Sequence, residues 1–352
     1  MEAMAEDKKK KPVRRPPSAT LTRRALVFVA AGAVLAAIAT FVVAGFEGTD
    51  ATDGSNSGAS PSTGAVAGEA FGTSTSGDCL SWTALDASDL TQVDCEQSHL
   101  FEVVQDIDLS VFPGAEWGPG SRFPSVMRFT ELRDEQCAPA AMDYLGGHFD
   151  PHGKFSIGLI NPGEAGWAAG ERTLRCGLQF SSTTGNLLPI KGPVADQDQS
   201  RAWDVGLCIG INNGVPADPV ECSKPHAFEV VATVDLSENF PGGLPSVEDQ
   251  DAYLERTCTE RVNEYLNDPD GLRSKTLTLF WDNVNFDSWL AGSRKVNCSV
   301  GKQVDGGGFA SITGSAKGDI LIDGQPPVPP PPQPEGRSLP TPLPGAAPLP
   351  GA

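Results

Sequence analysis

The chain has 352 residues, of which 39% are hydrophobic, and its formal net charge is −19. This length allows two ordinary domains, but the hydrophobic fraction is low for so long a chain, which indicates that parts of it do not join a core. Residues 1–24 hold eight Lys or Arg and three acids (+5), so residues 25–352 carry −24, and so acidic a body argues against nucleic acid or an anionic membrane surface as its partner.

A basic tail and an apolar segment begin the chain. Residues 25–46, ALVFVAAGAVLAAIATFVVAGF, contain no charge, and as a helix they would span roughly 33 Å, enough to cross a hydrocarbon core of ~30 Å. The cations in residues 1–24 favour a cytoplasmic N-terminus, which places residues 47–352 outside the cell. A cleaved signal peptide is the alternative, but its apolar part is usually only about 7 to 15 residues long. We therefore predict a single-pass cell-membrane protein whose transmembrane helix is Ala25 to Phe46.

Low-complexity stretches flank the part that can fold. Residues 47–76 are mostly Gly, Ser, Thr and Ala with a few acids and no apolar periodicity, which is typical of a flexible spacer. Residues 323–352 contain PPVPPPPQP and PLPGAAPLPGA, which predict an extended, disordered, Pro-rich tail without a hydrogen-bonded core. Such a tail is either simply solvated or a ligand for a partner, and its composition favours the first interpretation.

The rest of the chain contains an internal duplication. CEQSHLFEVV at residues 95–104 returns as CSKPHAFEVV at 222–231, and WAAGERTLRC at 167–176 returns as WLAGSRKVNC at 289–298. The repeated phrases keep their order and have similar gaps, so two homologous domains are expected. We assign these domains to residues 77–181 and 205–322, joined by a linker at 182–204.

Both copies predict the same elements, with alternating apolar residues in the strands and helical spacing in the helices. In the first copy, strands are predicted at residues 79–85, 91–95, 99–107, 154–160 and 173–180, and the main helix at 128–145. In the second copy, the main helix is predicted at 246–266 and the last two strands at 276–281 and 295–300. Each domain is therefore expected to be α+β, with a mostly antiparallel sheet and one main helix.

All eight cysteines follow the apolar segment, which fits an oxidising compartment outside the cell. Four cysteines in each copy allow three pairings, and hairpin symmetry helps to choose among them. Cys79 and Cys95 are symmetric about a turn at residues 86–89, and Cys208 and Cys222 about a turn near residue 215, so each pair can face across two strands. The other cysteines then pair by default. The predicted disulfides are Cys79–Cys95, Cys137–Cys176, Cys208–Cys222 and Cys258–Cys298.

Each repeated phrase contains a His and a Glu: His99 and Glu102 in the first copy, His226 and Glu229 in the second. Cys-x-x-x-His can indicate zinc, but a structural zinc site uses four ligands with a close Cys pair, and these cysteines are at least fourteen residues apart. A general base oriented by Glu is another interpretation, but residues three apart on a strand point to opposite faces. Neither copy has a familiar nucleophile or phosphate-loop motif. We therefore expect no metal, no cofactor and no enzyme activity, and a structural His that begins a core strand.

Trp167 and Trp289 are each followed five residues later by an arginine, Arg172 or Arg294. Such a pair can form a ligand platform by stacking, or the Trp can pack over a strand and fill the core. Core packing is the favoured interpretation. His148 and His152 have no counterpart in the second copy and are expected to be loop residues.

The combined motifs resemble the septum formation family of actinobacterial envelope proteins. They are the membrane segment, the spacer, Gly-Asp-Cys-Leu at 77–80, the Cys-x-x-x-His phrase, a helical Cys and Trp-x-x-Gly-x-Arg-x-x-x-Cys. The resemblance covers residues 77–301 and departs most at Gly206-Leu207-Cys208, where the acid before the cysteine is absent. It implies a bacterial single-pass membrane protein linked to cell division. It brings no catalytic residues, because the family has no assigned activity.

The sequence therefore predicts a non-enzymatic envelope protein that binds or scaffolds another envelope or division component. A sensor or binding module for a cell-wall ligand is one alternative. An envelope hydrolase that depends on His99 or His226 is another. In each case the expected partners are the membrane and an envelope protein or wall component, and no nucleic acid.

Overall fold

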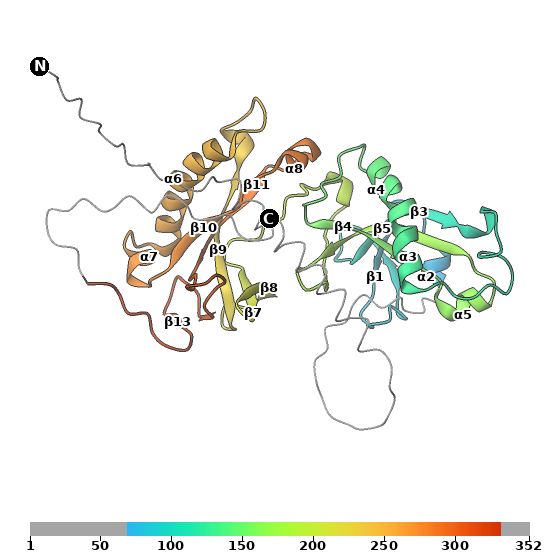
Figure 1. Ribbon diagram of the computed structural model, residues 1–352, viewed down its shortest axis with the longest axis horizontal. Coiled ribbons are helices and arrows are strands. Elements are labelled where there is room, and N and C mark those ends of the chain that lie inside the picture. Colours follow the sequence, from blue (N-terminus) through green and yellow to red (C-terminus); the bar gives the residue numbers. More distant parts are fainter. Residues whose placement is uncertain (1–68, 332–352) are drawn as a thin grey trace, which may run out of the picture. The chain divides into compact units, whose positions relative to one another are not determined.

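The computed structural model describes residues 69–331 (Figure 1). The predicted transmembrane helix and most of the predicted spacer lie outside these residues, as do residues 332–352. Within the described range, no helix combines the length and the apolar character needed to cross a membrane.

The first copy is built on an antiparallel sheet with the strand order β2-β1-β3-β5-β4, and β6 pairs with β5. Its strands are β1 (Cys79–Ser81), β2 (Thr91–Val93), β3 (Phe101–Asp108), β4 (Phe155–Ile160), β5 (Thr173–Ser181) and β6 (Leu187–Leu188). Its helices are α2 (Glu69–Thr73), α3 (Val126–Leu132), α4 (Ala138–Tyr144) and α5 (Gly163–Ala168). This mixture of an antiparallel sheet and few helices agrees with the predicted α+β class.

The second copy repeats this plan with the order β10-β11-β9-β12-β13, and β7 pairs with both β8 and β9. Its strands are β7 (Cys208–Asn212), β8 (Val215–Val220), β9 (His226–Asp235), β10 (Thr278–Trp281), β11 (Lys295–Gly301), β12 (Ile312–Thr313) and β13 (Leu321–Ile322). Its helices are α6 (Val247–Leu266), α7 (Gly271–Ser274) and α8 (Phe286–Ala291). In Figure 1 the long helix α6 lies along the sheet that contains β9, β10 and β11.

A serine cap begins the main helix of each copy. The Ser125 hydroxyl accepts a hydrogen bond from Arg128 N, and the Ser246 hydroxyl accepts one from Asp249 N, which satisfies backbone donors that have no partner within the helix. In α6, every fourth residue from Gln250 to Leu266 is buried, so one stripe of the helix faces the sheet.

The main helix of the first copy is interrupted where that of the second copy is continuous. A π-helical turn at Arg133–Cys137 separates α3 from α4, and Pro139 follows it at the start of α4. Proline has no N–H to donate to the carbonyl four residues earlier, so the regular ladder cannot pass through this point. Glu260, which stands two residues after Cys258 as Pro139 stands after Cys137, leaves α6 unbroken.

The four disulfides match the predicted pairing. Cys79–Cys95 and Cys208–Cys222 close the hairpins, with Cα–Cα distances of 5.3 and 5.2 Å. The other two disulfides join the main helix to a central strand, β5 or β11, in the hydrophobic core. These are Cys137–Cys176 and Cys258–Cys298, with Cα–Cα distances of 5.0 and 5.5 Å.

The last residues of the predicted spacer are folded. Helix α2 buries Phe71, which is 3% exposed and packs with Leu80 and Phe101. The hydroxyl of Ser74 accepts a hydrogen bond from Arg175 Nε at 3.1 Å. Residues 69–76 therefore pack on the first domain and are not flexible spacer, because Phe71 gives an otherwise polar segment an apolar anchor in the core.

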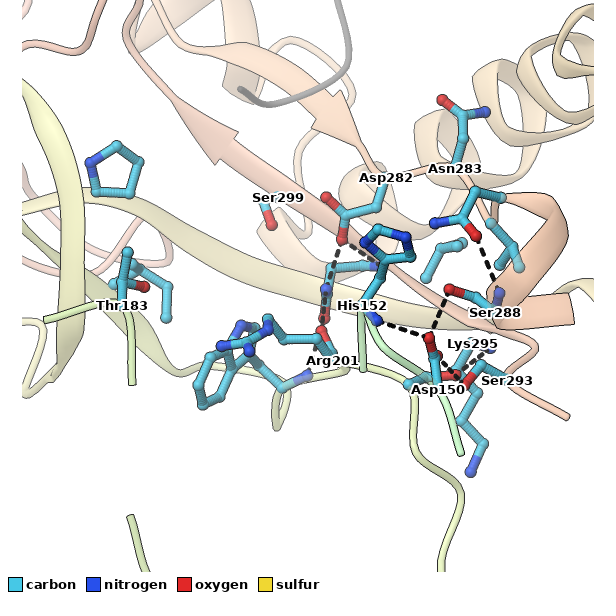
Figure 2. Close-up of a pocket in the computed structure, with 18 of the residues that line it drawn as sticks. Asp150, His152, Thr183, Arg201, Asp282, Asn283, Ser288, Ser293, Lys295 and Ser299 are labelled. Atoms are coloured by element: carbon cyan, nitrogen blue, oxygen red, sulfur yellow. Dashed lines mark hydrogen bonds between the residues drawn. The ribbon is translucent and has the colours of Figure 1, made fainter. Parts of the chain in front are cut away.

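Contacts also join residues of the two copies. Asp150 is 1% exposed, and its carboxylate accepts hydrogen bonds from Ser288 Oγ at 2.9 Å and Ser293 Oγ at 2.6 Å (Figure 2). The rings of Phe180 and Trp203 stack with centroids 5.5 Å apart. The predicted linker, residues 182–204, thus contributes an aromatic ring to these contacts.

Removing the helix-to-strand disulfide should cost more stability than removing the hairpin disulfide. In the chain-entropy model, a loop of 39 residues (Cys137–Cys176) corresponds to about 4 kcal/mol and one of 16 residues (Cys79–Cys95) to about 3 kcal/mol. Both double Cys→Ala variants should therefore unfold at a lower urea concentration than the unchanged protein. The variant without Cys137–Cys176 should have the lower midpoint of the two. A full-length protein whose urea midpoint does not change on reduction would contradict a structural role for the disulfides.

Candidate functional site

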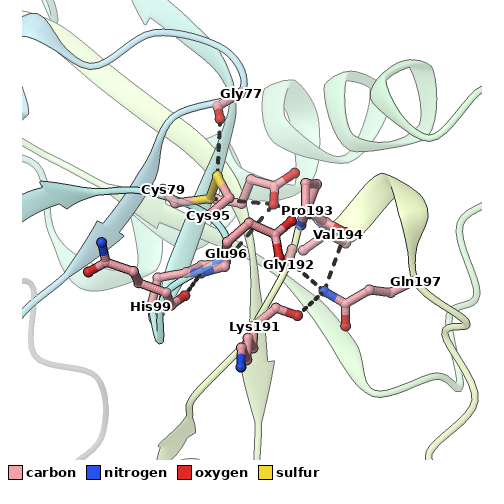
Figure 3. A network of polar contacts seen from close by, with 12 residues as sticks. Gly77, Cys79, Cys95, Glu96, His99, Lys191, Gly192, Pro193, Val194 and Gln197 are labelled. Atoms are coloured by element: carbon pink, nitrogen blue, oxygen red, sulfur yellow. Dashed lines mark hydrogen bonds and ion pairs between the residues drawn. A yellow bond between two sulfur atoms is a disulfide. The ribbon is translucent and has the colours of Figure 1, made fainter.

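A buried carboxylate lies beside the hairpin disulfide of the first copy, Cys79–Cys95. Figure 3 labels this disulfide together with His99 and Val194. Glu102 on β3 is fully buried, and its Oε2 lies 3.7 Å from Cys79 Sγ. Oε1 accepts a hydrogen bond from the Tyr144 hydroxyl at 2.7 Å, and Oε2 accepts one from Val194 N at 2.8 Å. The helix, the strand and the segment after β6 therefore meet at one carboxylate, which we call the carboxylate node.

The second copy has the same node. Glu229 on β9 is 2% exposed and accepts hydrogen bonds from the Tyr265 hydroxyl at 2.5 Å and from Ala316 N at 2.6 Å. The hydroxyl of Ser315 adds a third donor at 2.7 Å. A buried carboxylate is tolerated only when hydrogen bonds replace its water, and both copies meet that requirement with equivalent groups.

The segments that close the two nodes are also equivalent, which the sequence analysis missed. Ile190 pairs with His99 and Ile312 with His226, and the N–H groups of Gly192 and Gly314 bond the carbonyls of the second hairpin cysteines at 2.7 Å. Each Ile-x-Gly begins fourteen residues after the last cysteine of its copy (176 to 190, 298 to 312). This shared spacing is the sequence pattern that could have identified the two closing segments. Residues 190–194, in the predicted linker, therefore complete the first node.

His226 begins the core strand β9 and His99 stands just before β3, but one sequence argument about these histidines was wrong. His99 and His226 are 0% and 1% exposed, and the Nδ1 atoms lie 3.0 and 2.9 Å from the carbonyls of Gln97 and Lys224. His99 Nε2 is 4.0 Å from Glu102 Oε2, although residues three apart on a strand were expected not to meet. The alternation of side chains between the two faces of a strand does not apply to His99, because this residue precedes β3 and forms only an isolated bridge.

The carboxylate nodes bring together the residues that could hold a metal ion within the described range. Cys79, Cys95 and Glu102 form one such group, and Cys208, Cys222 and Glu229 form the other. Zinc binds cysteine as the thiolate, whereas the sulfurs in each group are bonded to one another. In this oxidised form the groups therefore do not fit a metal.

The hydroxyl that the helix contributes to each node should be worth a measurable part of the stability. Burial and the hydrogen bond to Glu229 raise the pKa of Tyr265, so this hydroxyl stays a donor. Tyr265→Phe should lower the free energy of unfolding by about 1.5 to 3 kcal/mol, the usual range for a hydrogen bond to a charged group. Tyr253→Phe is the control, because the Tyr253 ring packs against Phe240. If urea unfolding gave the same loss in free energy of unfolding for both variants, the role assigned to the Tyr265 hydroxyl would be contradicted.

Protonation of His226 should destabilise the fold. Burial lowers the pKa of His226, so the unfolded chain takes up a proton more readily than the folded one. The free energy of unfolding should therefore fall as pH drops below ~6.5, by at most about 1.4 kcal/mol per pH unit from this residue. Urea midpoints across this range should depend less on pH in His226→Gln than in the exposed control His148→Gln. Identical pH dependence in the two variants would contradict the prediction.

The paired Trp and Arg residues form a second duplicated structure. The Arg172 guanidinium carbon lies 4.0 Å from the Trp167 ring centroid, and that of Arg294 lies 3.9 Å from the Trp289 ring centroid. Each arginine also donates to the backbone carbonyl of its Trp, at 2.7 and 2.6 Å. The Trp rings are 2% and 9% exposed. Both rings lie in hydrophobic cores, as the packing interpretation expects, and not on an open platform.

A cavity of about 210 Å³ lies elsewhere, between β11, the β7–β8 hairpin, residues 200–203 and the loop around Asp150 (Figure 2). Asp282 follows β10, and its Oδ2 accepts hydrogen bonds from Asn297 N and Nδ2 at 3.2 and 2.6 Å. Burial raises the pKa of Asp282. Ser299 on β11 also lines the cavity and is 1% exposed. Sequence analysis did not select these residues, because they come from segments that only the fold brings together.

Two homologous α+β copies, each with two internal disulfides and a carboxylate node, define the structural class of this protein. The chain belongs to the septum formation family, whose profile matches residues 76–298. It is 43% identical over 338 residues to an uncharacterized membrane protein of Mycobacterium tuberculosis, found in strains H37Rv and CDC 1551, and the match covers 94% of this chain and 75% of each relative. No solved structure matches the chain. The family resemblance predicted from the motifs is therefore confirmed.

Proposed function

We propose that this chain is a non-enzymatic, membrane-tethered envelope protein whose two domains bind another envelope component during septum formation. Membership of the septum formation family supports the link to division. Relatives that are membrane proteins support the tether, for which residues 25–46 are the proposed helix. Four disulfides support a location outside the cytoplasm, where disulfides persist.

The observation that carries the proposal is the internal use of the duplicated polar side chains. His99, Glu102, Trp167 and Arg172 are each at most 6% exposed, and His226, Glu229 and Trp289 at most 9%. Their hydrogen bonds go to backbone groups and to hydroxyl groups of the same domain, which is what a framework residue requires. Two copies of such a framework support a role in presenting surfaces to a partner.

The same burial disfavours a hydrolase that depends on the histidines. A general base must come within hydrogen-bond reach of the proton that it removes from a substrate or water. The imidazoles of His99 and His226 are enclosed by the β-sheet, the hairpin and the closing segment, and their Nδ1 atoms already face backbone carbonyls. A scaffold therefore accounts for these residues with fewer assumptions than a catalyst.

Live-cell localisation tests this proposal. A fluorescent protein fused to the cytoplasmic N-terminus of the full chain should concentrate at division sites, and deletion of the chain should alter septum placement or frequency. A matched fusion that keeps residues 1–76 but lacks residues 77–322 should remain peripheral without enrichment at septa, because the binding surfaces are missing. In vivo crosslinking from the two domains should capture an envelope component from the full chain alone.

Two results would contradict the septal role. One is a uniform peripheral signal through the division cycle together with normal septa in the deletion strain. The other is equal septal enrichment of the fusion without residues 77–322, which would assign recruitment to the N-terminal part of the chain.

A further inference from the structure

The cavity near Asp282 lies against the sheet of the second copy, and its walls there differ from the corresponding positions of the first copy. In the first copy, Gly158 pairs with Gly177 across β4 and β5, and the Phe101 ring lies on this glycine pair. A Cβ added at Gly177 would lie 2.1 Å from Phe101 Cε1. The aromatic ring therefore fills the space over the sheet at this position.

The second copy replaces this packing. Phe280 pairs with Ser299 at the position where the first copy pairs two glycines. Ser299 corresponds to Gly177 because each directly follows the last cysteine of its copy. Phe228, the counterpart of Phe101, packs on Phe309 with ring centroids 5.8 Å apart, and it forms one wall of the cavity. Where Phe101 covers a glycine pair in the first copy, the second copy places Ser299 at the cavity wall.

Two polar groups on the walls of this cavity have hydrogen-bonding capacity that no described residue uses. The Ser299 hydroxyl is buried and has no hydrogen-bond partner among the described residues. Asp282 uses Oδ2 for Asn297, whereas no described residue donates to its Oδ1. Their counterparts in the first copy are Gly177 and Ile160, so the same strands form without either polar group. An unpaired buried hydroxyl is costly, and a ligand would offset that cost.

The other charged groups on the walls are already paired. The Asp150 carboxylate accepts from Ser288, Ser293 and the N–H of His152. The Arg201 guanidinium donates to the carbonyls of Ser181 and Gly153, at 3.3 and 3.1 Å. Lys295 Nζ lies 3.7 Å from Asp198. The walls carry two carboxylates and two cationic groups, so their formal charges cancel and favour an uncharged ligand.

Size and apolar walls narrow the ligand further. A volume of about 210 Å³ is roughly seven times the ~30 Å³ that one water occupies in the liquid, which suits one small ring and excludes a folded segment. Trp203, Ile209 and Phe228 supply apolar and aromatic surface, while Asp282 and Ser299 offer acceptors to hydroxyl groups. A sugar ring has both an apolar C–H face and a hydroxyl edge.

We propose that this cavity binds a neutral, polyhydroxylated ligand of the size of one sugar ring. Ligand hydroxyls donate to Asp282 Oδ1 and exchange hydrogen bonds with Ser299 Oγ, and the C–H face of the ring packs on the aromatic wall. The inference goes beyond the septal role, because it assigns a small-molecule site and does not depend on where the protein is recruited. The ligand is either a free sugar or the terminal ring of a glycan.

Ligand-observed NMR on the purified full-length chain tests the site, in a detergent without a sugar headgroup. The probes are glucose, galactose and N-acetylglucosamine, with glucosamine as the cationic match, glucuronate as the anionic match, and a neutral trisaccharide. At least one neutral probe should bind saturably and more tightly than its charged matches. Binding of a monosaccharide supports a free sugar, and binding of the trisaccharide alone supports a glycan end.

Two variants connect binding to the named groups. Asp282→Asn should weaken binding about tenfold or more, since it places an amide donor where the acceptor was. Asp319→Asn is the control, because it makes the same change of charge on an exposed residue outside the cavity. Ser299→Ala should also weaken binding while the thermal midpoint of the unliganded protein stays the same or rises, because the variant removes an unpaired hydroxyl.

Several results would overturn the proposal. No saturable binding of any neutral probe would remove the site, and stronger binding of glucosamine than of the neutral sugars would make it a cation site. Unchanged affinity in both Asp282→Asn and Ser299→Ala would place the binding elsewhere. Septal localisation of the full chain would be unaffected by each of these outcomes, so failure of this site and failure of the septal role are distinguishable.

Discussion

The buried carboxylate beside each hairpin disulfide is the constraint on which the rest of the domain depends. A carboxylate without water must receive hydrogen bonds from several directions, and here the donors come from elements far apart in the sequence. Glu102 takes them from Tyr144 on α4 and from the backbone at Val194, and Glu229 takes them from Tyr265 and Ala316. Satisfying one charge therefore sets where the helix ends, where the hairpin lies and where the closing segment returns.

The disulfides and the carboxylate nodes act on the same elements. One disulfide of each copy closes the hairpin next to the node. The other holds the main helix on the central strand about two helical turns before the tyrosine. The covalent links limit the freedom of the unfolded chain, and the hydrogen bonds select one arrangement of the folded one. This combination adds covalent and polar constraints to the hydrophobic core of each copy.

The duplication separates the residues that both copies share from those that only one copy has. Features present in both copies, such as the Glu of the carboxylate node and the Trp that stacks on an Arg, are buried and contribute to the stability of the fold. Features present in only one copy are not required for the fold that both copies share. The Ser299 hydroxyl at the cavity wall is such a feature, since the first copy has Gly177, covered by Phe101, at the corresponding position. This feature lies in the second copy.

The sequence by itself determined the α+β repeat, the family and all four disulfides, because these follow from local patterns: strand alternation, helical spacing, and cysteines placed symmetrically about turns. It did not determine that His99 approaches Glu102, that Phe71 folds onto the domain, or that residues 190–194 close a node. Only the tertiary structure decided these points and the cavity around Asp282. Burial and hydrogen bonding between distant segments depend on how the sheet, the helix and the loops pack, and no local pattern records that packing.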